Sequence, residues 1–128
     1  MILVDTSVWA NHLRAKEPRL RALLENRLVV LHPFVLGELA CGTLPKRAGT
    51  IAAFEKLPVA AIASEQEVRH LLDSRRLWGS GLGWIDLHLL ASAVVGQLRL
   101  WTADRAMASA ASSLGIAFPE GSSRQLLT

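Results

Sequence analysis

The chain has 128 residues, which is enough for a substantial hydrophobic core, and we expect residues 1–128 to form a single domain. Hydrophobic residues make up 51% of the chain and charged residues 20%, a composition that is typical of compact globular proteins and argues against intrinsic disorder. The net charge of +3 comes mainly from arginine, whose guanidinium group matches phosphate oxygens and so favours a phosphate-bearing partner.

The segments predicted as strands and helices alternate along the chain. In chain order, strands are predicted at residues 2–4, 28–31, 59–62 and 98–101. Helices are predicted at residues 6–14 and 18–27 after the first strand, 33–42 and 47–57 after the second, 64–77 and 83–96 after the third, and 104–115 after the fourth. Ser64 and Glu67 form a capping box at the start of the fifth helix. This alternation predicts an α/β sandwich around a mainly parallel central sheet.

The longest apolar run and the single cysteine indicate a soluble cytoplasmic protein. Polar residues interrupt the run at residues 87–100, which falls short of the roughly 20 residues of a membrane span. The start of the chain does not have the pattern of a signal peptide. Cys41 cannot form a disulfide within the chain, which fits a reducing compartment. Because its neighbours in GELACGTL are apolar, we expect a buried and unreactive thiol.

Four of the eleven acidic residues lie among apolar neighbours. Asp5 follows MILV, Glu38 lies within PFVLGELAC, Asp86 lies between GWI and LHLLASAVV, and Asp104 follows LRLWTA. Asp5 and Asp104 end predicted strands and therefore point toward the carboxyl edge of the sheet, where ligands bind in α/β folds. Asp86 lies in the first turn of its helix, and Glu38 lies in the helix after the second strand. We therefore expect the four acids to face one cleft.

Acids that converge in this way favour a bound metal ion. Two carboxylates about 4 Å apart repel each other by roughly 4 kcal/mol at an effective dielectric near 20. A hard divalent cation removes this repulsion, and carboxylate oxygens together with water are the ligand set of Mg²⁺ or Mn²⁺. Structural alternatives remain open for each acid: Asp5 and Asp104 as helix N-caps, Asp86 as a favourable charge at a helix start, and Glu38 as the partner of an arginine.

Four segments, LVDTSVW, GELACG, GWIDLHLLASA and LWTADRAM, resemble in order and spacing the motifs of PIN-domain ribonucleases, most closely the VapC-type toxins of toxin–antitoxin pairs. The resemblance covers essentially the whole chain and implies a PIN-like α/β/α sandwich. It further implies an endoribonuclease dependent on Mg²⁺ or Mn²⁺, a VapB-type antitoxin that blocks the site, and a homodimer. Related toxins cut transfer RNA or ribosomal RNA.

The resemblance maps the family's acidic quartet onto Asp5, Glu38, Asp86 and Asp104. Asp5 and Asp86 are the expected direct metal ligands, whereas Asp104 and Glu38 would complete the site directly or through water. The family's hydroxyl positions fall on Thr6, Ser7 and Thr102, which can support the carboxylates by hydrogen bonds. Helix capping is an equally open interpretation of Thr6 and Ser7.

The segment RHLLDSRRLWGSGLGW is the expected route of RNA to the cleft. Arg75 and Arg76, with Arg69, are candidates to contact phosphates, and Trp78 or Trp84 to stack on an unpaired base. Alternatively, the two neighbouring arginines pair with Asp73, and Trp84 belongs to the core.

Other kinds of chemistry, such as zinc binding by the histidines or phosphotransfer, have weaker support in the sequence. The four histidines show no zinc-ligand spacing, and His88, two residues after Asp86, is expected to be structural rather than a general base. Two other functions remain open: a non-catalytic module that binds RNA or protein, and an aspartyl-phosphate phosphotransfer domain with Asp5 as nucleophile. Against the latter, DTS lacks the second aspartate that such a phosphatase places two positions later.

Overall fold

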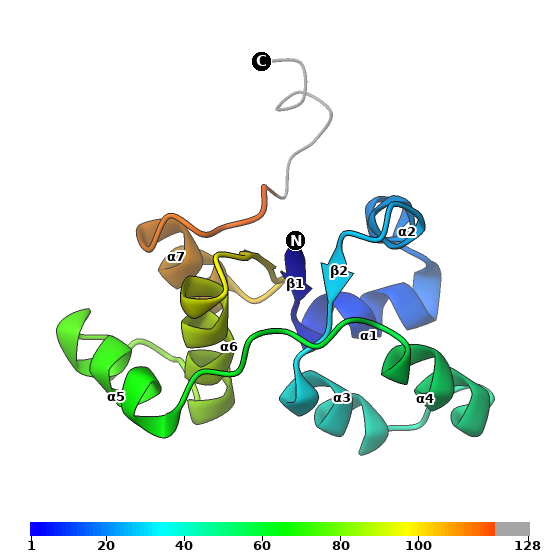
Figure 1. Cartoon of the computed structure of the whole chain (residues 1–128), viewed down its shortest axis with the longest axis horizontal. Coiled ribbons are helices and arrows are strands. Elements are labelled where there is room, and N and C mark those ends of the chain that lie inside the picture. The colour runs from blue at the N-terminus through cyan, green and yellow to red at the C-terminus, as the bar shows by residue number, and fades with distance from the viewer. Residues whose placement is uncertain (120–128) are drawn as a thin grey trace, which may run out of the picture.

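A three-stranded parallel sheet forms the centre of the protein in the computed structural model, which describes residues 1–119. The strands are β1 (Ile2–Val4), β2 (Val29–Val30) and β3 (Arg99–Trp101). Their order is β2-β1-β3, so the first strand is central (Figure 1). Ile2 lies opposite Val29 on one side and Arg99 on the other. The first, second and fourth predicted strands are therefore confirmed, the second and fourth with narrower bounds, and their carboxyl ends lie at one edge.

The strand predicted at residues 59–62 is wrong. Only Val59 pairs, in a single parallel bridge with Leu31. The Leu31 N–H donates to the Pro58 carbonyl at 2.8 Å, and the Ala60 N–H donates to the Leu31 carbonyl at 2.9 Å. Because β2 is only two residues long, the rest of residues 59–62 finds no strand residues there to pair with. A similar bridge at the opposite edge joins Leu100 to Ala117, which the sequence did not indicate.

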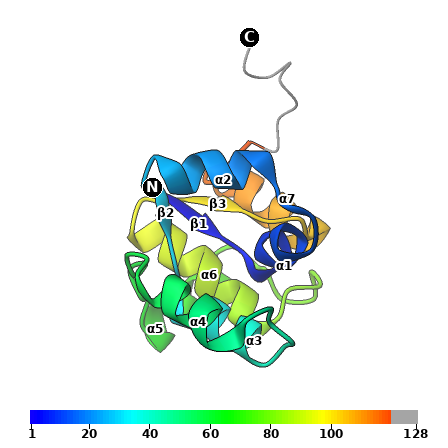
Figure 2. The same cartoon turned by 90° about the vertical axis from the view of Figure 1, so that its right-hand side faces the viewer.

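Within residues 1–119 seven helices cover the sheet, and each of the seven predicted helices is confirmed. They are α1 (Thr6–Ala15), α2 (Pro18–Glu25), α3 (Pro33–Ala40), α4 (Arg47–Glu55), α5 (Glu65–Ser74), α6 (Trp84–Val95) and α7 (Arg105–Ser113). Figure 2 shows the strands between α2 and α7 above and α3, α4, α5 and α6 below, which is the predicted α/β/α sandwich. The capping box of Ser64 and Glu67 starts α5 as expected.

The core follows from the strand and helix patterns, with one correction. Leu3 and Leu100 from the sheet and Leu89 and Leu90 from α6 are among its fully buried side chains. Cys41, however, is exposed, contrary to expectation. The buried side of α3 is formed by Val35 and Leu39, four residues apart on one helix face, and a residue two positions after Leu39 projects from the other face. Among residues 1–119, no helix combines the length and apolar character needed to cross a membrane.

Candidate active site

Asp5 directly follows the central strand and is only 6% exposed. Its Oδ2 accepts a hydrogen bond from the Ser7 hydroxyl at 2.7 Å and another from the Thr102 hydroxyl at 2.8 Å. Asp5 occupies the N-cap position of α1, but its side chain makes no capping hydrogen bond. The capping interpretation of this carboxylate is therefore wrong, and its charge faces two hydroxyl groups instead.

The two hydroxyls are held in place by backbone groups of the segment between β3 and α7. The Ala103 N–H donates to the Ser7 hydroxyl at 3.0 Å, and the Asp104 N–H donates to the Thr102 hydroxyl at 3.0 Å. Because each hydroxyl oxygen already accepts an N–H, its own proton is directed to Asp5. Residues 95 to 97 positions apart in the sequence thus meet at one carboxylate.

Glu38 joins the same region through α1. The Thr6 hydroxyl donates to Glu38 Oε1 at 2.7 Å, which links the first residue of α1 to α3. The ion pair found in residues 1–119 is between Arg21 and Glu25, so the alternative in which an arginine neutralises Glu38 is wrong. Thr6, like Ser7, bonds a carboxylate side chain rather than capping its helix.

Asp86 and Asp104 each cap a helix with one oxygen. Oδ2 of Asp104 accepts the Met107 N–H at 3.0 Å and so caps α7, as the structural alternative predicted. Oδ2 of Asp86 accepts the Gly83 N–H at 2.8 Å at the start of α6. Capping does not exclude a second use, since a carboxylate has two oxygens.

The charges of three of these acids act on one another. Burial raises the pKa of Asp86, the Gly83 N–H opposes this rise, and the negative charges of Asp5 and Asp104 add to it. Asp86 therefore lies within electrostatic reach of both strand-end aspartates. Glu38 is connected to the end of β1 through its bond to Thr6, and the convergence of the four carboxylates on one metal ion stays a prediction.

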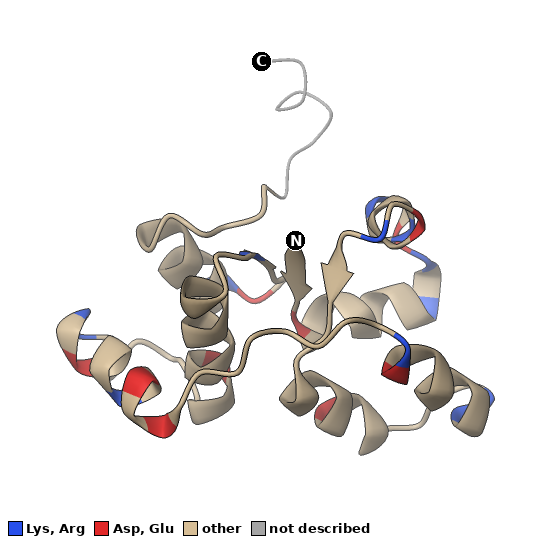
Figure 3. Cartoon of the chain, in the orientation of Figure 1, with Lys and Arg blue, Asp and Glu red and all other residues tan. Residues whose placement is uncertain are grey.

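The donor set fits a hard divalent cation. Figure 3 shows acidic positions at the carboxyl end of β1 and on α3 and α6. In each of the four carboxylates one oxygen accepts the hydrogen bonds described above, and the other accepts none from residues 1–119. Within that range no three Asp, Glu, His or Cys side chains already stand at ligand spacing. This arrangement fits Mg²⁺, which is commonly held by one or two carboxylates and several waters.

The expected RNA contacts lie in different places. Arg75 lines a cavity of about 330 Å³ together with Arg99, the first residue of β3, so it lies at the amino edge of the sheet, opposite the carboxylates. Trp78 is 61% exposed in the loop that leads to α6. Neither Arg75 nor Arg76 forms an ion pair with Asp73 in the described part of the chain.

A row of aromatic rings along α3 and α6, the helices that carry Glu38 and Asp86, was largely missed from the sequence. His32, Phe34, His88 and Trp84 contact one another in that order. Trp84 is 43% exposed, so its assignment to the core is wrong, whereas His88 is buried, which fits the structural role expected for it. The spacing of four residues between Phe34 and Glu38 was the available signal, because such residues share a helix face.

His32 caps α3 and is fully buried. Its Nδ1 accepts the Phe34 N–H at 2.9 Å, while no group in residues 1–119 bonds its Nε2. Burial, with a smaller contribution from His88, lowers the pKa of His32 to about 4. The imidazole is therefore neutral at physiological pH, and its role is structural.

The parallel sheet, the covering helices and the converging strand-end carboxylates define a PIN-type nuclease domain. A family model described as PIN domain matches residues 2–112, and the chain belongs to this family. At the level of individual proteins, it is 44% identical over 121 residues to Ribonuclease VapC32 of Mycobacterium tuberculosis, in strains CDC 1551 / Oshkosh and ATCC 25618 / H37Rv. The match covers 94% of this chain and 98% of each relative.

The family and its relatives identify the chain as an endoribonuclease of the VapC toxin type, a hydrolase of RNA phosphodiester bonds. PIN-domain ribonucleases of this type generally depend on a divalent metal ion. This excludes both other functions that the sequence left open, the non-catalytic module and the aspartyl-phosphate domain.

Proposed function

We propose that this endoribonuclease binds Mg²⁺ or Mn²⁺ at Asp5, Asp86, Asp104 and Glu38 and cleaves RNA there. The observation that supports this most directly is the raised pKa of Asp86, to which the charges of Asp5 and Asp104 contribute. A carboxylate such as Asp86, which two neighbouring negative charges disfavour, retains its ionised form most easily beside a cation. Asp5 and Asp86 are the proposed direct ligands, and Asp104 and Glu38 complete the site directly or through water.

The protein's own groups would prepare this site in distinct ways. A bound divalent ion would supply a polarised water and neutralise the charge that builds on the phosphate. The hydroxyls of Ser7 and Thr102 occupy Oδ2 of Asp5 and leave Oδ1 for the ligand role. Thr6 likewise orients Glu38, whose remaining oxygen, or that of Asp104, is suited to align the attacking water.

We propose transfer RNA or ribosomal RNA as the substrate and a VapB-type antitoxin as the partner that blocks the site, with the cytoplasm as the compartment. The resemblance to Ribonuclease VapC32 supports the class of partner. Arg76 and Trp78 are proposed RNA contacts because they lie in the loop that leads to Asp86. Arg75 can reach only RNA that extends to the amino edge of the sheet.

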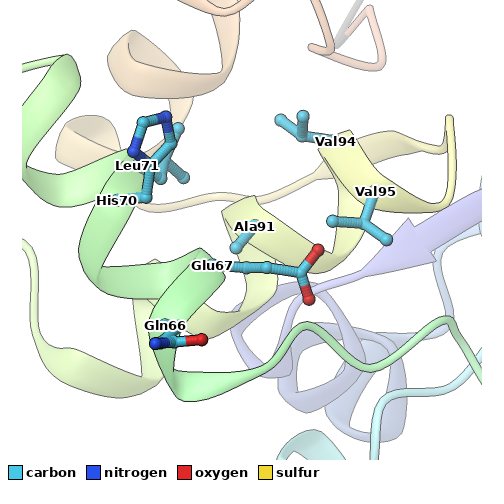
Figure 4. A pocket seen from close by; sticks show the side chains of 7 residues that line it. All are labelled: Gln66, Glu67, His70, Leu71, Ala91, Val94 and Val95. Atoms are coloured by element: carbon cyan, nitrogen blue, oxygen red, sulfur yellow. The ribbon is translucent and has the colours of Figure 1, made fainter.

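A homodimer is also proposed, and the face formed by α5 and α6 supports it. A cavity of about 380 Å³ lies between these helices and is lined by Leu71, Ala91, Val94 and Val95, with Gln66, Glu67 and His70 around them (Figure 4). Val94 is 43% and Val95 47% exposed, which is unusual for adjacent valines at the end of a largely buried helix. A second copy that covers this face would bury them.

The test of the metal site uses purified protein and total bacterial RNA. We expect cleavage with Mg²⁺ or Mn²⁺, and we expect both EDTA and Asp5→Asn to abolish it. Asp73→Asn removes an exposed carboxylate outside the four and should leave cleavage intact. Sequencing the new RNA ends identifies the class of RNA that is cut. Undiminished cutting by Asp5→Asn would show that the site is elsewhere.

A further inference from the structure

Two exposed aromatic side chains lie on the helices that carry Glu38 and Asp86 without being part of the core. Phe34 is 40% and Trp84 43% exposed. Trp84 begins α6, two residues before Asp86, and Phe34 lies on α3, four residues before Glu38. Four residues of helix advance about 6 Å along the axis and return to the same face. Phe34 and Glu38 therefore share one face of α3. Trp84 and Asp86 both lie in the first turn of α6 but project about 200° apart around its axis. Each of these two helices thus carries one carboxylate and one exposed aromatic ring.

The two rings are connected through His88. The ring centroids of Phe34 and His88 are 4.9 Å apart at an interplanar angle of 68°, and those of Trp84 and His88 are 4.8 Å apart at 87°. Such edge-to-face contacts are favourable and restrain the rings. His88 is only 8% exposed, so it forms the buried support between two rings that both remain open to solvent. His32 supports Phe34 from the other side, with centroids 5.0 Å apart.

An exposed aromatic surface of this kind suits a protein that acts on RNA. Proteins that recognise RNA loops hold the unstacked bases against aromatic side chains, because every base offers a flat π face. An RNA strand whose phosphate lies at the acids brings the neighbouring base close to α3 and α6. We propose that Phe34 and Trp84 form a nucleobase-binding subsite, on which an unpaired base beside the scissile phosphate stacks. This inference rests on the proposed function, since it places the scissile phosphate at the carboxylates.

The first experiment measures cleavage of a random-sequence pool of single-stranded oligoribonucleotides with Mg²⁺. Trp84→Ala is expected to lower kcat/KM by about 5- to 150-fold, the usual effect of losing one base–aromatic stack. Trp84→Phe, which retains a π face, should stay within about threefold of wild type. Trp84→Leu, which retains apolar bulk without a π face, should behave like Trp84→Ala. Phe34→Ala and Phe34→Tyr provide the corresponding pair on α3.

The matched control is Leu28→Ala. The exposed fraction of Leu28, 41%, is similar to that of Trp84. Leu28, however, precedes β2 at the amino edge of the sheet, away from the acids. The Leu28→Ala variant should leave kcat/KM unchanged. Thermal melting of every variant separates loss of the subsite from loss of fold, and Trp84→Leu carries the test if Trp84→Ala melts below the assay temperature.

Two results would overturn the subsite. If Trp84→Leu cleaves as well as wild type, then an aromatic face is not what the position supplies. If Trp84→Ala cleaves normally but escapes inhibition by the antitoxin, then the exposed rings bind protein rather than RNA.

A binding experiment separates this inference from the metal-site proposal. In the Asp5→Asn background with Mg²⁺, a short single-stranded oligoadenylate containing one 2-aminopurine reports stacking through quenched fluorescence. We expect quenching that Trp84→Ala removes and Trp84→Phe retains. Equal quenching in all three proteins rejects the subsite, whatever the outcome of the cleavage test. Cutting of the oligomer by Asp5→Asn, in contrast, rejects only the proposed ligand role of Asp5.

Discussion

At the level of single residues, each carboxylate of the site uses one oxygen to accept hydrogen bonds from residues 1–119 of the protein and leaves the other free of them. Asp5 gives one oxygen to Ser7 and Thr102, and Asp86 gives one to the Gly83 N–H. Hydrogen bonds of this kind fix the orientation of a ligand and strengthen its interaction with a metal ion. The oxygen that remains is the one available for chemistry.

Asp86 is expected to increase the cleavage rate and to lower the stability of the folded protein when no metal is bound. Its pKa is raised, so at neutral pH the ionised form is disfavoured in the folded protein, and this cost disappears as the pH falls through the raised pKa. Asp86→Asn retains an oxygen for the Gly83 N–H and removes the charge. We expect the variant to lose at least about 100-fold in cleavage rate.

Thermal melting in EDTA checks the stability half of this prediction. The melting temperature of Asp86→Asn should exceed that of wild type, by about 2–8 °C for each kcal/mol of repulsion removed. The same substitution at the exposed Asp73 should leave the melting temperature nearly unchanged. A lower melting temperature for Asp86→Asn would contradict the repulsion between Asp86 and the two strand-end aspartates.

Thr102 is expected to act through Asp5. Thr102→Val preserves the shape of the side chain but removes the hydroxyl that donates to Oδ2 and accepts the Asp104 N–H. We expect the Mg²⁺ concentration for half-maximal cleavage to rise by about 10- to 100-fold, because the ligand loses its orientation. Thr43→Val, at an exposed position between α3 and α4, is the matched control. An unchanged metal requirement in Thr102→Val would remove Thr102 from the site.

At the level of elements, α3 and α6 carry two of the carboxylates, and each of these helices begins at a side-chain cap. His32 caps α3, and Asp86 completes the capping arrangement of α6. Asp86 therefore lies in the anchored first turn of α6, whereas Glu38 lies near the end of α3, where Thr6 bonds it. Anchoring of this kind limits the positions that Glu38 and Asp86 can take, which favours a preorganised site.

The lowered pKa of His32 predicts that the folded protein loses stability in weak acid. The folded-state pKa is lowered to about 4 from the ordinary value of 6.5. Between these two values the unfolded chain binds a proton that the folded protein does not, so stability falls as the pH drops from 6.5 to 4 and is unaffected above 6.5. The lowered pKa corresponds to about 3 kcal/mol at most.

Urea unfolding at pH 7 and pH 4.5 measures this loss in wild type and in His32→Asn. Asparagine still caps α3 through its side-chain oxygen, but it does not titrate. The variant should lose less stability between the two pH values than wild type, even if it is less stable at pH 7. His70→Asn, on the exposed side of α5, is the matched control for removal of an imidazole. Identical losses in wild type and His32→Asn would refute the prediction.

At the level of the whole molecule, the acids and the exposed valines lie on different surfaces. The carboxylates gather at the carboxyl edge of the sheet, whereas Val94 and Val95 lie at the far end of α6. Association through the face of α5 and α6 would therefore leave the carboxylates accessible to RNA. This separation permits a dimer in which each subunit keeps its own site.

The proposed dimer is tested by Val95→Glu. A charge placed at this 47% exposed position costs little in the monomer but cannot be buried against a second copy. We expect the variant to elute as a monomer where the wild-type protein elutes as a dimer, with an unchanged melting profile at low concentration. Val59→Glu, at a 66% exposed position on the sheet edge, is the comparison. Dimers of Val95→Glu would place the interface elsewhere.

Local sequence patterns were sufficient for most of the fold. Helix periodicity, the capping box at Ser64 and the short apolar runs correctly predicted the seven helices and three strands of residues 1–119, although a fourth predicted strand was wrong. These signals act between residues close in the chain. The position of Asp5 and Asp104 after strands also predicted that they would share an edge, since parallel strands end together.

Contacts between distant segments settled the remaining features. The bond from Thr102 to Asp5, the exposure of Cys41 and Trp84, and the lack of a fourth strand at residues 59–62 had no local signal. Burial depends on what other segments cover a side chain, and a strand forms only where a partner is long enough to pair with it. The order of strands and helices along the sequence thus determined where the acids lie. Only the tertiary structure determined which hydroxyls bond them and which rings are exposed on the same helices.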